Sequence, residues 1–436
     1  MTARPDTPKV RPPRGVWLLL LVILASRIAL VACASHLHGG DGGRYMREAV
    51  NMVDHGVFSA DDAAPPQPSA HDAPLYPLLL AGLYKASGGV HLAGRLASYL
   101  NAFIFAIAAL GVYRLASRLS REHGQTVGVA SVVVFALMPG SLPYSVFHMP
   151  DTLFACILIW ASVLLVEHAL THRSACAIGA FALIGVSVMV KPVALLFPLV
   201  LCVVVIGMAR ATPLKRRLLV AGLGLLIHGG ALLPWCARNW VVFGVPHLSS
   251  IVGTNTFGEN YRVMLEELGV EHVGGVMAQQ RKAARIASGT EWENPMVRSA
   301  ALTDIAKREV MAHLPTYLMA AVKQHPRLYI GTGTIALVGM LGVSPDDPRF
   351  DLEIAKRARS PRDVLQLPPL MLALQISAWV VLLGCYALVV LGIWRSARSA
   401  DPAGRRLLLL GLLYFALIYG PLTATRYRFA MTPYMS

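Results

Sequence analysis

Six charged residues at the ends of apolar stretches could act together on a substrate. They are Asp41, Asp151, Lys191, Arg238, Arg426 and Arg428. A carboxylate at the boundary between water and hydrocarbon is partly desolvated, which raises its basicity and suits a general base. Lysine and arginine bind phosphate oxygens through charge-assisted hydrogen bonds. The residue types therefore predict a base beside a site for an anionic headgroup.

Asp41 lies in a glycine-rich stretch that runs from His36 to Tyr45. As an alternative to catalysis, Asp41 could cap the following helix, whose apolar face would include Tyr45 and Met52. His36 and His38 could join Asp41 as metal ligands, but no second cluster of ligands lies near them in the sequence. We therefore predict no cofactor; a divalent metal is compatible with the sequence but not indicated by it.

Three other charged residues also have structural alternatives. Asp151 follows Pro150 and could cap the next helix. Lys191 precedes Pro192 at a tight turn and could be an orientation charge, although positive charges are usually kept on the cytoplasmic side. Arg27 lies within the first apolar stretch, where an unpaired charge is costly. It therefore needs either a structural partner or a ligand.

The composition is that of a polytopic membrane protein. Of the 436 residues, 55% are hydrophobic and 14% are charged, and the mean hydropathy is +0.56. These values exclude an ordinary soluble domain. The net charge of +15 does not indicate nucleic acid, because much of it lies in short clusters that flank apolar segments and face lipid headgroups. The six cysteines show no metal-binding spacing and are interpreted as apolar fillers.

Nine apolar stretches are long enough, or nearly so, to cross a membrane as helices. They run from about 16 to 35, 92 to 114, 126 to 147, 151 to 170, 174 to 190, 192 to 209, 217 to 237, 370 to 394 and 406 to 424. With the N-terminus cytoplasmic and the first stretch a retained signal anchor, the basic clusters fall inside, as the positive-inside rule requires. We therefore predict an all-α helical bundle in which the six charged residues share the outer face.

The chain divides by composition into three parts. Residues 1–237 would form a transmembrane catalytic module with a first outer loop at 36–73, residues 238–369 a large outer region, and residues 370–436 the C-terminal transmembrane helices. Segments 74–86 and 327–343 are apolar but fit interfacial or re-entrant helices better than spans. The proline-rich segment 63–74 lacks helical periodicity and is predicted to be a loop.

A series of short motifs follows one order along nearly the whole chain. They are Asp41-x-x-x-Tyr45, Ala73-Pro-Leu-Tyr-Pro-Leu78, Pro150-Asp-Thr-Leu-Phe154, Val190-Lys-Pro-Val-Ala194, Leu233-Pro-Trp-Cys-Ala-Arg-Asn239, and Arg426-Tyr-Arg428 with Pro433. In this order the motifs resemble those of bacterial membrane glycosyltransferases of the GT-C class, near the protein O-mannosyltransferase and aminoarabinose transferase families. The resemblance implies a GT-C type helical bundle.

The resemblance also implies roles for individual residues. In such enzymes an outer-loop aspartate is the proposed base, and basic residues hold the phosphate of a polyprenyl-phosphate sugar donor. Carried over, the catalytic residues are Asp41 and Asp151, and the substrate-binding residues are Tyr45, Lys191, Arg238, Asn239, Arg426 and Arg428. The chain departs from the pattern at Gly42, where protein O-mannosyltransferases usually carry Glu, and at Asp151, where relatives often have Glu.

The predicted function is transfer of a hexose or pentose from a polyprenyl phosphate to a glycan, lipid or protein acceptor, with inversion. The site would lie at the periplasmic face of a bacterial inner membrane, among membrane lipids. A lipid or solute transporter or flippase is the main alternative, because outward charges could form half of an alternating-access pathway. A non-catalytic envelope assembly subunit is the third. The sequence does not indicate the sugar, the acceptor or the oligomeric state.

Overall fold

The computed structural model describes residues 12–37, 40–120, 123–208, 212–345, 347–357, 361–399, 402–419, 428, 431–432 and 434–435. Every regular element within these residues is a helix. Among them, five helices are long and apolar enough to cross a membrane, by length and composition. The prediction of an all-α, polytopic membrane protein is confirmed.

Helices occupy all nine apolar stretches that the sequence predicts as spans. The five long ones are α1 (Arg14–Cys33), α4 (Val90–Leu119), α7 (Asp151–Thr171), α10 (Leu214–Phe243) and α20 (Pro369–Ser399). The shorter ones are α5 (Gly124–Leu137), α8 (Ser174–Val190), α9 (Phe197–Met208), which follows the short η1 (Pro192–Ala194), and α21 (Pro402–Tyr419). The stretch from 126 to 147 is interrupted, contrary to prediction. Met138, which precedes Pro139, leaves the helical conformation with a ψ of 119°, and Gly140 is left-handed with φ of 91° before the short α6 (Ser141–Tyr144).

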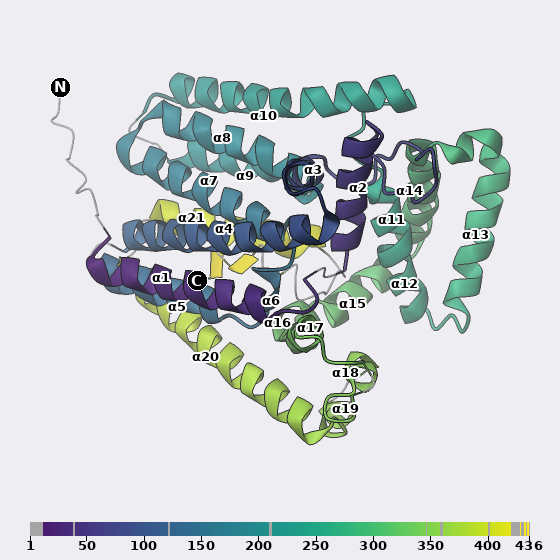
Figure 1. The fold of residues 1–436 in the computed structure, drawn as a ribbon. Coiled ribbons are helices and arrows are strands. Elements are labelled where there is room, and N and C mark those ends of the chain that lie inside the picture. Colours follow the sequence, from purple (N-terminus) through teal and green to yellow (C-terminus); the bar gives the residue numbers. More distant parts are fainter. Residues whose placement is uncertain are drawn as a thin grey trace.

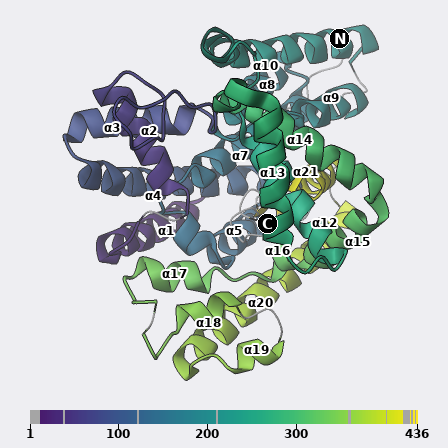
Figure 2. The same ribbon diagram turned by 90° about the vertical axis from the view of Figure 1, so that its right-hand side faces the viewer.

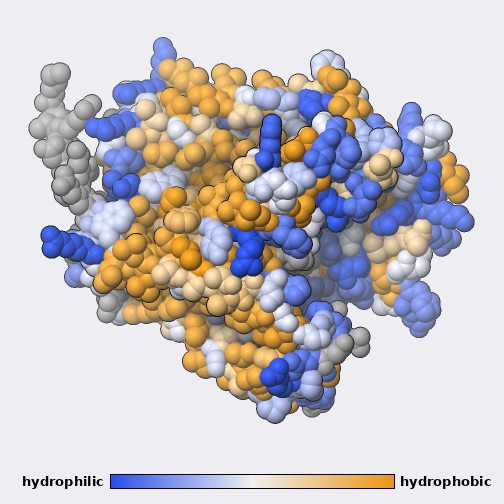
Figure 3. Space-filling view, viewed as in Figure 1, coloured by the Kyte–Doolittle hydropathy of each residue, from blue (hydrophilic) through white to orange (hydrophobic). Residues whose placement is uncertain are grey.

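The long helices pack side by side into a bundle, with α7 between α4 and α8 and with α8 against α10 (Figure 1). Their shared core contains stacked Phe105 and Phe135, whose ring centroids are 4.7 Å apart. Much of the remaining apolar surface is uncovered: 11% of the apolar window of α20 and 28% of that of α1 are buried. Figure 3 shows hydrophobic residues spread over this bundle. Such a surface is stable in lipid rather than in water.

Shorter helices gather at one end of the bundle. There α2 (Gly42–Asp54) runs across the direction of the long helices, and α3 (Leu75–Ser87) packs against it (Figure 1). The region beyond α10 adds α11 (Ile251–Asn255), η2 (Thr256–Tyr261), α12 (Arg262–Glu267), α13 (Val273–Ser288), η3 (Gly289–Glu293), α14 (Pro295–Ala312) and α15 (Leu314–Gln324). Figure 2, seen toward this end, shows α13 and α14 lying across it.

Four further helices connect this region to α20. They are α16 (Pro326–Ile330), α17 (Thr334–Met340), α18 (Leu352–Arg357) and α19 (Pro361–Leu365). The apolar segment 327–343 is thus broken into α16 and α17, and α3 has 13 residues. None of these pieces is among the helices long enough to span. That they lie at the interface or re-enter the membrane stays a prediction.

The segment between α2 and α3 has no helix from residue 55 to residue 74, so the prediction of a loop over residues 63–74 is confirmed. It is held by hydrogen bonds to its backbone carbonyls. The Asn51 amide donates to the carbonyls of Ser59 and Asp61 at 2.8 and 2.9 Å. The Arg238 guanidinium donates to the Ser69 carbonyl at 2.8 Å, and the Ser250 N–H donates to the Ala70 carbonyl at 2.7 Å. The loop is therefore fastened to α2, to α10 and to the outer region.

Candidate active site

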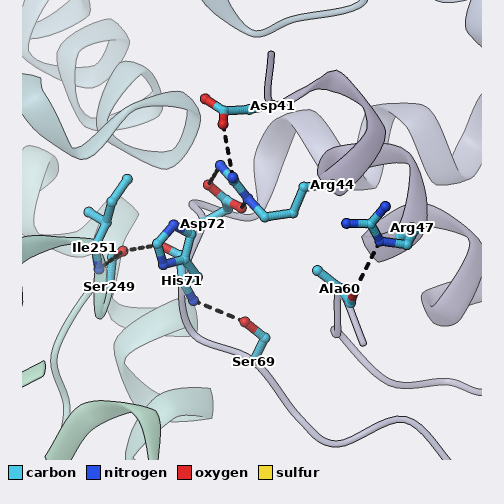
Figure 4. Close-up of polar contacts among 9 residues, drawn as sticks. All are labelled: Asp41, Arg44, Arg47, Ala60, Ser69, His71, Asp72, Ser249 and Ile251. Atoms are coloured by element: carbon cyan, nitrogen blue, oxygen red, sulfur yellow. Dashed lines mark hydrogen bonds and ion pairs between the residues drawn. The ribbon is translucent and has the colours of Figure 1, made fainter. Parts of the chain in front are cut away.

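Asp41, Arg44 and Asp72 form a continuous chain of charges at the end of the bundle (Figure 4). One guanidinium nitrogen of Arg44 donates to Asp41 Oδ1 at 2.9 Å. The other two donate to the two carboxylate oxygens of Asp72 at 2.5 and 3.1 Å. The Asp41 and Arg44 side chains are 28% and 25% exposed, whereas that of Asp72 is 2% exposed. Asp41 is thus the carboxylate of this chain that a substrate can reach.

The start of α2 explains the position of Asp41. Asp41 is the N-cap residue, but its side chain makes no capping hydrogen bond and turns to Arg44, three residues along the helix. Burial opposes the charged form of Arg44, yet the hydrogen bonds and negative charge of Asp72 outweigh it and raise the pKa of Arg44. Side-chain capping is therefore not the role of Asp41, and Arg44 holds its carboxylate in place.

Glu48 is a buried acid beside this chain, and sequence reasoning missed it. It lies one helical turn beyond Arg44, is 0% exposed, and neither carboxyl oxygen has a hydrogen-bond partner among the described residues. Burial, followed by the negative charge of Asp72, raises the pKa of Glu48 to about 10. Glu48 is therefore a neutral acid at neutral pH.

Glu48 predicts a pH dependence of stability. Its pKa is raised in the folded protein, so the folded state binds more protons than the unfolded state between pH 4.5 and about 10. The stabilising contribution is fully present below pH 4.5 and is lost as the pH rises toward about 10. Glu48→Gln, which keeps the neutral form, should make the thermal unfolding midpoint in detergent micelles less sensitive to pH. Glu291→Gln, at an exposed glutamate, should leave the profile unchanged; equal profiles for all three proteins would refute the assignment.

Asp151 and Lys191 form a second, more buried ion pair. Lys191 ends α8 in an extended conformation, as expected for a residue before proline. Its ammonium lies 2.7 Å from Asp151 Oδ1, and the two side chains are 17% and 4% exposed. Asp151 is the first residue of α7 and not its N-cap, which is Pro150, so the capping alternative is wrong in detail. A carboxylate in the first helical turn is still favoured by the helix dipole.

Tyr45 is influenced by charges of both ion-pair groups. Its ring is 8% exposed and meets the Tyr76 ring edge-on at 5.7 Å between centroids. Burial, followed by the negative charges of Asp72 and Asp41, raises its pKa, and Asp151 adds to the rise. The structure therefore brings Asp41, Asp151, Lys191 and Tyr45 into one neighbourhood. Contact of Tyr45 with a substrate stays a prediction.

His148 explains why glycine follows Asp41. A Cβ atom at position 42 would lie 2.9 Å from His148 Cδ2 and 3.2 Å from its carbonyl oxygen. The His148 ring is also close to Gly94, and the residue is 5% exposed. A glutamate at position 42 would have to displace this ring. The departure from the protein O-mannosyltransferase pattern thus has a steric cause.

Gly42 and Gly43 form a matched pair of substitutions. Gly42→Ala should destabilise the protein by about 1 kcal/mol or more, because overpacking forces His148 to move. At Gly43 the nearest atom to an added Cβ is Arg47 Nη1 at 4.0 Å. Gly43→Ala should therefore be neutral or stabilise α2 by up to about 1 kcal/mol. Thermal unfolding in micelles measures both. If the Gly42 variant were as stable as the Gly43 variant, close packing on His148 would be disproved.

Arg238 and Asn239 hold the end of α10 to its surroundings. The Arg238 guanidinium lies 4.8, 5.1 and 5.6 Å from the ring centroids of Trp235, Phe243 and Phe58. Asn239 is 0% exposed, accepts from Arg238 and donates to the carbonyls of residues 247 and 248. The Asn239 amide is thus occupied by structural bonds. Its predicted substrate contact, like that of Arg238, remains untested.

The C-terminal arginines are placed only in part. Arg426 lies outside the described residues. Arg428 is 1% exposed and donates to the carbonyls of Pro139, at 2.6 Å, and Tyr329. Arg27, the charge within the first span, donates to Ser145 Oγ at 3.1 Å and to the Ala136 carbonyl at 2.8 Å. Arg27 therefore has structural partners, which favours the structural alternative over contact with a ligand. Among the described residues, no group of three potential ligands is arranged to hold a metal ion.

Comparison with known proteins identifies a family to which part of the chain is similar. Residues 71–235 match the family described as dolichyl-phosphate-mannose-protein mannosyltransferase. This segment contains Asp72, Asp151 and Lys191. The predicted resemblance to membrane glycosyltransferases related to the protein O-mannosyltransferases is confirmed. The match supports a general glycosyltransferase role. No curated protein matches the chain.

Several solved structures are similar to the chain. ArnT from Cupriavidus metallidurans, bound to undecaprenyl phosphate, has a TM-score of 0.45 and 17% identity, covering 95% of this chain and 77% of that one. AglB from Archaeoglobus fulgidus, in complex with an inhibitory peptide and a dolichol-phosphate, has a TM-score of 0.48 and 14% identity, covering 97% and 49%. The chain spans about half the length of AglB. These likenesses are too distant to assign an activity.

Proposed function

We propose that this protein transfers a sugar from a polyprenyl phosphate to an acceptor hydroxyl, with Asp41 as the general base. The observation that carries the proposal is the partly exposed Asp41 carboxylate, held by Arg44, in a protein that also has a second carboxylate–cation pair, Asp151 with Lys191. The family match over residues 71–235 supports the class of donor, since its name specifies a lipid phosphate sugar. The positive-inside pattern supports a periplasmic site in a bacterial inner membrane.

The proposed reaction is a single displacement at the anomeric carbon. Asp41 removes the proton of the acceptor hydroxyl, and the oxygen attacks the face opposite the lipid phosphate. The bond from the anomeric carbon to the phosphate oxygen breaks, and the polyprenyl phosphate leaves with the bonding electrons. Sugar transfer therefore inverts the anomeric configuration. Cations near the leaving phosphate stabilise its growing charge.

The burial of the charged groups separates their proposed roles. Asp151, with its side chain 4% exposed, orients Lys191, and Lys191 contacts the donor phosphate. Arg238 remains a proposed donor contact at the end of α10. Arg428 is 1% exposed, whereas the Lys191 side chain is 17% exposed. Arg428 therefore offers a donor much less surface than Lys191 does. Its proposed part is to fasten α16 to the chain around Pro139.

The test is a donor comparison with the full chain in lipid nanodiscs. Radiolabelled polyprenyl-phosphate sugars, polyprenyl-diphosphate sugars and nucleotide sugars are each incubated with membrane acceptor extract. Label should move to acceptor from the polyprenyl phosphate alone, and the product should have the inverted anomeric configuration. Transfer from a nucleotide sugar, or retention of configuration, would reject the mechanism. In proteoliposomes, movement of the labelled donor across the bilayer without transfer would show a flippase instead.

A further inference from the structure

A polar cavity lies between the first outer loop and the region beyond α10. Its volume is about 90 Å³, and its polar lining consists of Ser69, His71, Ser250, Thr254, Arg298 and Ser299. Binding pockets for whole small molecules usually have volumes of roughly 300 to 1,000 Å³. This cavity therefore has room for one small group of a larger substrate.

The cavity is a built feature, because two distant segments are joined around it. The Ser250 N–H donates to the Ala70 carbonyl at 2.7 Å, and the Ser249 hydroxyl donates to the His71 carbonyl (Figure 4). The Gly253 N–H donates to Ser299 Oγ at 3.0 Å, which holds α11 against α14. These bonds fix the loop, α11 and α14 relative to one another.

Arg298 supplies a positive charge to the lining of the cavity. It lies in the first turns of α14 and is half-buried. Among the residues that the structure describes, no carboxylate forms an ion pair with it. By contrast, Arg262 on α12 pairs with Glu259 and Glu266. A half-buried guanidinium that lines a polar cavity is a ready partner for an anion.

The other lining groups also suit an anion. Burial lowers the pKa of His71, and although the charge of Asp72 opposes this, Arg44 and Arg298 add to the lowering. His71 is therefore neutral at neutral pH and has a ring N–H to donate. Ser69 Oγ accepts from the backbone N–H of His71 at 3.1 Å, and Ser299 Oγ accepts from the backbone N–H of Gly253. Each hydroxyl proton thus remains available for a ligand. The side chains that line the cavity include no acid.

The cavity is connected to the proposed base through consecutive contacts. His71 lines the cavity, and the next residue, Asp72, holds Arg44, which holds Asp41. The charge of Asp41 is also felt at His71. We infer that the cavity binds an anionic group of the acceptor, a phosphate monoester or a carboxylate, so that the acceptor is a hydroxyl compound with a separate negative charge. This inference rests on the proposed function.

The direct test is anion binding to the full chain in nanodiscs of zwitterionic lipid, without donor or acceptor. Inorganic phosphate binding is followed by ³¹P NMR titration, with acetate and the neutral methyl glucoside as competitors. Arg298→Gln should weaken phosphate binding about 10-fold or more, because a charge-assisted hydrogen bond is lost. Arg308→Gln, at an exposed arginine on the same helix, should have no effect. Unchanged binding in the Arg298 variant would overturn the inference.

A second variant guards against misfolding. Ser250→Ala removes one lining hydroxyl and leaves the backbone bond of Ser250 to Ala70 intact. It should weaken phosphate binding by a smaller factor than Arg298→Gln. Acetate should displace phosphate and methyl glucoside should not. Displacement by methyl glucoside would mean that the cavity recognises sugar hydroxyls, and the anionic assignment would be wrong.

Transfer kinetics separate this inference from the proposed function. In Arg298→Gln the KM for the acceptor should rise while the KM for the polyprenyl-phosphate sugar stays the same. A rise in the donor KM alone would place the donor phosphate in the cavity and overturn the inference. If the wild type transferred no sugar, the proposed function would fail, yet phosphate binding that depends on Arg298 would still establish the anion site. If Arg298→Gln transferred sugar with an unchanged KM for the acceptor, the proposed function would be supported. The inference that the cavity binds an anionic group of the acceptor would then be wrong.

Discussion

Asp41→Asn is expected to reduce sugar transfer by roughly 100- to 10,000-fold, the range typical for loss of a general base. The amide cannot take the proton of the acceptor hydroxyl. Arg44 should stay in place, because its two bonds to Asp72 remain. Donor binding should therefore persist, and the defect should lie in turnover. Single-turnover transfer and donor binding, measured separately, distinguish the two effects.

Two controls sharpen this experiment. Asp62→Asn changes an acid of the same outer loop whose side chain is 83% exposed, and it should transfer at the wild-type rate. Asp41→Glu keeps the base with a shifted position and should retain part of the activity. Wild-type turnover by Asp41→Asn would remove Asp41 from the mechanism. Equal loss of donor binding would make it a binding residue instead.

Asp72→Ala is expected to destabilise the protein by about 3 kcal/mol, because removal of one partner leaves the other charge of a buried pair uncompensated. The Asp72 and Arg44 side chains are 2% and 25% exposed. The variant should also transfer sugar poorly, since Arg44 no longer fixes Asp41. Thermal unfolding in micelles and the transfer assay measure the two effects. Asp304→Ala, at an exposed acid on α14, should alter neither.

A double substitution of Asp72 and Glu48 tests whether the two acids are coupled. The charge of Asp72 is one cause of the raised pKa of Glu48, so without Asp72 the Glu48 carboxyl should ionise more readily and partly compensate Arg44. Asp72→Ala combined with Glu48→Gln should therefore lose more stability than the two single changes add up to. Strict additivity would show that the two acids do not share Arg44.

Hydropathy predicted most of the spanning helices because lipid requires about 20 apolar residues for each crossing helix. The exception between Leu137 and Ser141 lies at Pro139 and Gly140, whose effect on the backbone hydropathy does not measure. The short outer helices were harder to predict. Segment 327–343 is mostly apolar but divides at residues 331–333 into α16 and α17.

The candidate site was predicted in part. Asp41 and Tyr45 are close in sequence, and Lys191 and Asp151 stand at helix ends that the sequence marks with prolines. Asp72 was missed because its contact with Arg44 joins positions 28 residues apart through tertiary packing. Glu48 did leave a signal. It lies three residues after Tyr45, on the face of α2 predicted to be apolar, where an acid is out of place.

In the outer loop between α2 and α3, residues 59–70 are held largely through their main chain, whereas Asp72 is held through its side chain. Asn51, Arg238 and Ser250 all bind carbonyl oxygens of residues 59–70 rather than side chains. Carbonyl groups are the same whatever residue carries them. Homologues could therefore exchange the exposed side chains of this segment freely and keep its path unchanged. The sequence of residues 59–70 can therefore vary while Asp41 and Arg44 keep their positions.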